Sequence, residues 1–213
     1  MRLATPALLL TAALACLPAL ASAGVVINEV DYDQPGTDTA EFIELKNNGP
    51  TAVNLGTYTL ELSNGASAGA LYLTIALPSV TLLGGGSYEI GFGSANPWHA
   101  DLTYNHLDNM VQNGSPDAIG LRDGGVLVDA VSYEGSTAAP YTEGTGTTAA
   151  DDNVTPFVSL SRFPDGQDTN NNDVDFSIRC LTPGAPNGSS TSACLSAVPV
   201  SRSTWGTLKS IYR

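Results

Sequence analysis

The stretch Ala40-Glu41-Phe42-Ile43-Glu44-Leu45-Lys46-Asn47 decides the fold, together with the apolar run at residues 25–30 before it. Both stretches are short, rich in β-branched or apolar residues and interrupted by carboxylates, which is typical of β-strands. The loop between them, residues 31–39, is rich in Asp, Pro, Gly and Thr, which favour turns over a helix. We therefore expect these stretches to be the first two strands of a β-sandwich.

Alternation within the second stretch predicts which side chains face the core. We expect Ile43 and Leu45 to point inward, with Glu41 on their side, bonding at the strand end. Phe42, Glu44 and Lys46 then share the outer face, where we expect Glu44 in an ion pair. Because Glu41 and Glu44 point to opposite faces, they do not form the carboxylate pair of a glycosidase.

The rest of the chain up to about residue 187 predicts more short strands and no long helix, because no stretch keeps a 3.6-residue apolar period. Alternating runs predict strands at 57–62, 71–77, 87–92 and 157–163. Asp123-Gly124-Gly125 lies between the runs 118–122 and 126–133, which indicates a hairpin. Residues 134–156 hold few large apolar side chains and are expected to form an exposed loop.

Residues 1–23 have the composition of a secretory signal peptide. Arg2 is followed by an apolar run to Leu20, and Ala21-Ser22-Ala23 precedes Gly24. This arrangement predicts export and cleavage after Ala23. The alternative is a membrane anchor, but the run is short and contains two prolines. Cleavage would leave one domain at residues 24–187 and a C-terminal segment at 188–213, in a product that is secreted or held at the cell surface.

Charge is distributed unevenly along the chain. Residues 24–195 contain all 21 acidic residues and four basic ones, a net charge of −17, whereas residues 196–213 carry +3. A body this acidic disfavours nucleic acid and anionic lipid as partners, because phosphate binding needs clustered Lys and Arg. It suits calcium or a saline medium. Cys180 and Cys194 are the cysteines that remain after cleavage, and in an oxidising compartment we expect them to form a disulfide.

Two acidic segments are candidates for binding calcium. Oxygen-bearing side chains alternate along the first in the way of a calcium loop, with Asp168, Asn170, Asn172, Asp173 and Asp175 as the candidate ligands. The segment departs from an EF-hand, since Asp173 replaces the glycine and Arg179 the final glutamate. An Asn/Asp-rich turn that caps its own backbone is the favoured alternative. In the second segment, Asp31, Asp33 and Asp38 are expected to lie on a solvated face. No motif requires a cofactor.

Two further segments predict binding rather than catalysis. Residues 93–117 form a long irregular stretch, and the candidate binding residues in it are Trp98, His99, Tyr104 and His106. The C-terminal segment combines apolar, aromatic and basic residues, and Trp205, Lys209, Tyr212 and Arg213 are candidates for sorting or docking. A frayed end is the alternative for this terminus. We identify no catalytic residues, because no nucleophile and base share a recognisable motif.

The ordered motifs resemble the lamin tail domain, an all-β, immunoglobulin-like β-sandwich found in animal lamins and in secreted bacterial proteins. The resemblance rests on residues 26–30, 41–47, 53–60, 118–121, 128–133, 159–162 and 182–187, which occur in the family's usual order. It implies a non-catalytic structural or binding module, and no catalytic residues to transfer. The alternative is an accessory recognition domain for an extracellular polymer, envelope protein or polysaccharide. An extracellular hydrolase would need a site that the sequence does not display.

Overall fold

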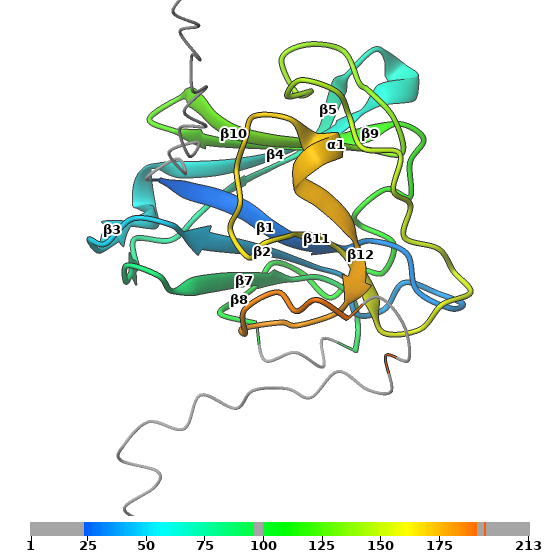
Figure 1. Ribbon diagram of the computed structural model, residues 1–213, viewed down its shortest axis with the longest axis horizontal. Helices are drawn as coiled ribbons and strands as arrows, with labels where there is room; N and C mark the ends of the chain where they lie inside the picture. The colour runs from blue at the N-terminus through cyan, green and yellow to red at the C-terminus, as the bar shows by residue number, and fades with distance from the viewer. Residues whose placement is uncertain (1–23, 96–99, 191–193, 195–213) are drawn as a thin grey trace, which may run out of the picture.

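The computed structural model describes residues 24–95, 100–190 and 194, and these form a β-sandwich (Figure 1). The strands are β1 (Val25–Asp31), β2 (Phe42–Asn47), β3 (Val53–Asn54), β4 (Tyr58–Asn64), β5 (Ala70–Ala76), β6 (Thr81–Leu82), β7 (Ser87–Gly91), β8 (Leu102–Thr103), β9 (Asp117–Asp123), β10 (Val126–Tyr133), β11 (Val158–Arg162) and β12 (Phe176–Cys180). The helices are the 3₁₀ turns η1 (Leu55–Thr57) and η2 (Gly65–Ser67) and the single α-helical turn α1 (Asn172–Asp175).

Two sheets make up the sandwich. The first sheet has the order β12-β11-β1-β2-β7-β8, and the second has the order β10-β9-β4-β5. All their pairings are antiparallel except that of β7 with β8. The expected hairpin is confirmed, since β9 and β10 pair on either side of residues 124–125. Gly124 and Gly125 both have positive φ angles, which tight hairpin turns require.

The core between the sheets follows the predicted alternation closely. Ile43 and Leu45 are fully buried in it, as are Leu60 and Leu62 of β4. The pattern fails only at the start of β5, where Leu71 is exposed and Tyr72 packs against the core. A bulge shifts the pairing of β4 with β5 between Leu62 and Ser63, so Leu71, which precedes the bulge in β5, does not share the inward face of Leu73 and Ile75.

The outer face of the first sheet is also buried, which was not predicted. Phe42 and Glu44, the two residues expected to face outward, both have 0% exposure. The expected ion pair of Glu44 is wrong: Lys46 pairs with Asp165 at 2.7 Å, and Glu44 accepts hydrogen bonds from Asn28 and the Gly184 backbone. The loops after β11 and β12 therefore form an additional layer over this face.

Candidate functional site

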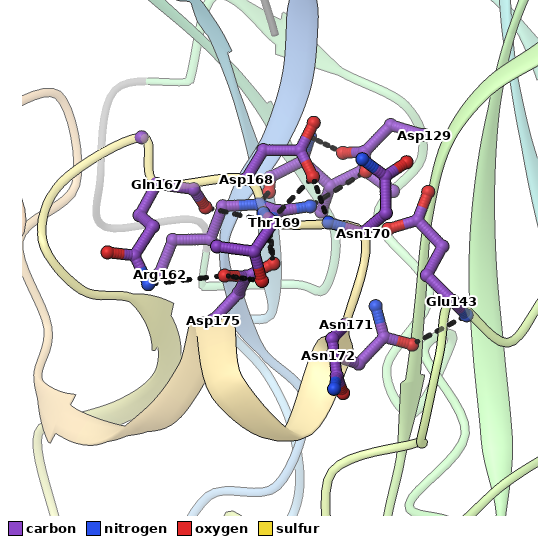
Figure 2. A network of polar contacts seen from close by, with 12 residues as sticks. Asp129, Glu143, Arg162, Gln167, Asp168, Thr169, Asn170, Asn171, Asn172 and Asp175 are labelled. Atoms are coloured by element: carbon purple, nitrogen blue, oxygen red, sulfur yellow. Dashed lines mark hydrogen bonds and ion pairs between the residues drawn. The ribbon is translucent and has the colours of Figure 1, made fainter. Parts of the chain in front are cut away.

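The predicted calcium segment, residues 168–175, does not form an open loop with all five side chains converging (Figure 2). Asn170 and Asp173 are exposed, whereas Asp168, Asn172 and Asp175 are buried. Asn172 bonds outward to β10, donating to the Ala130 carbonyl at 2.8 Å. The other two buried side chains accept bonds from their own turn, which is what a self-capping turn does. Calcium binding by this segment stays a prediction.

Arg162, at the end of β11, is the centre of the polar network in Figure 2 and has no exposed surface. Its Nη2 donates to Asp129 Oδ1 at 2.7 Å, and its Nη1 donates to Asp175 Oδ2 at 3.2 Å. Asp168 Oδ1 lies 3.7 Å from the same Nη1. The guanidinium also lies over the Phe176 ring, 4.4 Å from its centroid. One buried cation is therefore shared by three carboxylates.

This network completes an interrupted part of the first sheet. β11 pairs with β1 at Glu29 and Val30 only, so the backbone of Ile27 has no partner strand on that side. Arg162 Nε donates to the Ile27 carbonyl at 2.7 Å, and Asp129 Oδ2 accepts from the Ile27 amide. Because Asp129 comes from β10 of the second sheet, the pair joins the two sheets through the backbone of β1.

Asp129, Glu143 and Asp168 form an acidic group, each placing one carboxylate oxygen within 4.8 Å of the others. Burial raises the pKa of Asp129 although Arg162 lowers it, and burial together with the charge of Asp129 raises the pKa of Glu143 to about 8. Three such oxygens suit a hard cation. Arg162 already supplies a positive charge to Asp129 and Asp168, however, so the group is a buried ion network with Glu143 at its edge.

Other buried carboxylates hold loops through backbone amides. Glu41 accepts from Met110 and Val111, and its expected role in bonding at the strand end is confirmed. Asp117 accepts from Gly65 and Gly114 in the same way. Glu29 lies opposite Glu44 in the sheet and accepts from Thr182. Much of the acidic composition is therefore used inside the domain, in contacts between strands and loops.

The raised pKa values of two of these carboxylates predict that the domain is more stable in mild acid than at pH 8. Burial, followed by the charges of Asp38 and Asp108, raises the pKa of Glu41 to about 8 against its backbone bonds. Burial raises the pKa of Glu44 to about 7, with Asp165 adding to the rise and Lys46 opposing it. The ordinary value for both is 4.5. Since the folded state binds these protons more tightly, the stability they contribute is complete below pH 4.5 and is lost as pH rises through 7–8.

The melting temperature, measured with a chelator present, should therefore fall by several degrees between pH 5.5 and pH 8, at roughly 2–4 °C per kcal/mol for a domain of this size. Glu44→Gln cannot ionise at that position and should show a shallower fall, whatever its absolute stability. A wild-type melting temperature that is flat or rises over this range would contradict the prediction.

The predicted binding loop is described only in part. Trp98 and His99 lie outside the described residues. Tyr104 is 36% exposed and packs on Phe92 with ring centroids 5.9 Å apart, and His106 is exposed on the same loop. A separate groove of about 320 Å³ lies between residues 81–87 and 184–186. No aromatic side chain lines this groove, whereas ligand pockets are usually lined by aromatic and hydrophobic residues, so it gives no support to polymer recognition.

The expected disulfide between Cys180 and Cys194 is present and ties the start of the C-terminal segment to β12. The candidate sorting residues Trp205, Lys209, Tyr212 and Arg213, like the predicted signal peptide, lie outside the described residues. Within the described part, no helix approaches the length and apolar character that crossing a membrane requires.

The family model for the Lamin Tail Domain matches residues 18–135, which is more than half of the chain. The chain belongs to the lamin tail domain family. Lamin tail domains are immunoglobulin-like and non-enzymatic, and the sandwich seen here agrees with the immunoglobulin-like fold. The lamin tail match ends just after β10, so Asp129 lies inside it and Arg162 beyond it. No curated protein matches the chain.

Sequence reasoning missed the most connected residues of this lamin tail domain. Asp129 interrupts the apolar run of β10, and an isolated carboxylate in such a run is a signal for a buried partner. Arg162 is one of four basic residues in the stretch 24–195, which contains 21 acidic residues. The scarcity of positive charge there is a second signal. Neither signal identifies the partner, because 33 positions separate the two residues.

Proposed function

We infer that the protein is an exported lamin tail module that acts as a non-catalytic structural or binding domain at the cell surface. In this proposal the sandwich is the displayed part, and the C-terminal segment, residues 188–213, holds it to an envelope protein or polysaccharide. Family membership supports the non-catalytic module. The composition of residues 1–23 supports export.

The observation that carries the proposal is the disulfide at the start of the C-terminal segment. Cys194 is linked covalently to Cys180, the last residue of β12. Cys180 lies opposite Val158 of β11, so the cross-link is next to a paired part of the first sheet. A force applied to the segment beyond Cys194 would reach the sheet directly. Such a joint suits a domain that is tethered by its C-terminal end.

Removing residues 196–213 should move the protein from the cell fraction to the medium. This truncation keeps Cys194 and hence the disulfide, so it leaves the folded domain intact. Fractionation of producing cells, with immunodetection in both fractions, measures the distribution. A Trp205→Ala, Tyr212→Ala variant is the matched control at full length, and it should be released in the same way. An unchanged distribution of the truncated chain would remove the tethering role.

A further inference from the structure

Two fully buried aspartates at one end of the sandwich have carboxylate oxygens that lack hydrogen-bond partners. Asp31, the last residue of β1, and Asp151, between β10 and β11, are each 2% exposed. Oδ1 of Asp31 and both carboxylate oxygens of Asp151 are buried and accept no hydrogen bond. Buried carboxylates normally have bonds, as Glu41 and Asp117 have here. An orphan buried oxygen in a native structure calls for a partner, such as an ion.

The two residues come from segments that run side by side at one end of the sandwich (Figure 1). The Asp151 amide donates to the side-chain hydroxyl of Tyr32, the residue that follows β1, at 2.7 Å, so the two segments are in contact. After burial, the charge of Asp151 is the strongest influence raising the pKa of Asp31. Asp33, half-buried in the same loop, acts on Asp151 in the same sense. The expectation that Asp31, Asp33 and Asp38 lie on a solvated face is wrong, because Asp31 and Asp38 are buried and Asp33 is half-buried.

No basic side chain of the described residues neutralises this cluster. Each Lys and Arg in that part of the chain has another contact: Lys46 with Asp165, Arg122 with Glu61, Arg162 with Asp129, and Arg179 with the Phe163 ring. The Gln34 side chain and the backbone amides of residues 32, 33 and 152 favour the ionised carboxylates, but none of them reaches hydrogen-bonding geometry with Oδ1 of Asp31 or with either oxygen of Asp151. Two ionised groups buried together without a counter-charge are strongly destabilising. The missing charge must come from a proton or from a cation.

We propose that Asp31 and Asp151, assisted by Asp33, bind a calcium ion that joins the end of β1 to the segment before β11. Calcium fits this donor set, because it takes six to eight oxygen ligands from carboxylates, carbonyls and water in flexible geometry. Magnesium fits this donor set less well, because a bound magnesium ion keeps several of its water ligands. Two carboxylates that are each 2% exposed leave little room for that water. Zinc prefers nitrogen and sulfur ligands, and the cluster has none.

The test is the melting temperature of the full chain at pH 8, first with chelator and then with about 1 mM calcium, the range of extracellular calcium modules. Calcium should raise it by roughly 5–10 °C if the concentration is a hundredfold above Kd. Asp151→Asn should lose this rise. Asp173→Asn, which removes an exposed carboxylate from the other acidic segment, should keep it. Magnesium at the same concentration should give a smaller rise.

Three results would overturn the proposal. An Asp151→Asn variant that responds to calcium like wild type would place the ion elsewhere. Loss of the response in Asp173→Asn alone would place it in residues 168–175. No response in the wild type, with Asp151→Asn more stable than wild type at pH 8, would mean that Asp31 and Asp151 share a proton. If Asp151→Asn does not fold, calorimetric calcium titration of Asp33→Asn replaces it, and unchanged affinity there would contradict the site.

Discussion

Replacing Arg162 by Met is expected to lower the free energy of unfolding by about 3–5 kcal/mol, or to prevent folding. The substitution keeps much of the side-chain volume but removes the cation shared by Asp129, Asp168 and Asp175. It also removes the donor to the Ile27 carbonyl. Leaving carboxylates buried without their partner is more costly than removing the whole network. Denaturant unfolding followed by circular dichroism measures the effect.

Arg179→Met is the matched control for that experiment. Arg179 stacks on the Phe163 ring at 3.7 Å but remains partly exposed, so its loss should cost about 1 kcal/mol. Arg162→Lys keeps the charge but loses the planar guanidinium that donates to both Asp129 and the Ile27 carbonyl. Its free energy of unfolding should therefore lie between those of wild type and Arg162→Met. If the free energy of unfolding of Arg162→Met lies within about 1 kcal/mol of the wild-type value in the same measurement, the network does not hold the sheets together.

Ile43→Ala should cost about 2–5 kcal/mol of unfolding free energy, because Ile43 is fully buried between the two sheets. The loss combines the transfer energy of the removed methyl groups with the cavity they leave. Its closest neighbours across the first sheet, Val30 and Ile90, are also fully buried and part of the same core, so little collapse can fill the space. Thermal and denaturant unfolding both measure the change.

Leu83→Ala is the control for core burial, since Leu83 is 67% exposed and should change stability by less than about 0.5 kcal/mol. A neutral result for Ile43→Ala would mean that β2 presents its other face to the core. The register of the whole first sheet would then be wrong, because a shift by one residue moves every side chain to the opposite face.

The strands were predictable because their signals are local. Alternation over six residues is enough to place Leu60 and Leu62 inward, and Asp123-Gly124-Gly125 is enough to indicate a hairpin. Both depend on neighbours along the chain. The β5 bulge was not predictable, because the extra residue is visible only in the pairing with β4. The short strands β3, β6 and β8, of two residues each, carry too little pattern to be recognised.

The buried outer face of the first sheet was missed for a different reason. A Glu on the face of a strand opposite its core residues is normally solvated, and alternation puts Glu44 on the face opposite Ile43 and Leu45. Its partner, the Gly184 amide, is 140 residues away in sequence, and it belongs to a loop with no strand pattern. The same holds for Glu29 with Thr182, and the Ile27 amide that Asp129 accepts from, although it lies in a predicted strand, is 102 positions away. Contacts between a charged side chain and a distant backbone amide leave no periodic trace in the sequence.

The disulfide has a further consequence, for resistance to proteolysis. Cys180 and Cys194 are 14 positions apart and close a covalent ring around the residues between them. A single cut anywhere at residues 181–193 opens the ring but releases neither fragment, because the sulfur bridge still joins them. Shedding of the C-terminal segment by such a cut would require reduction as well. In an oxidising medium, a protease must cleave beyond residue 194 to separate the domain from the segment that follows it.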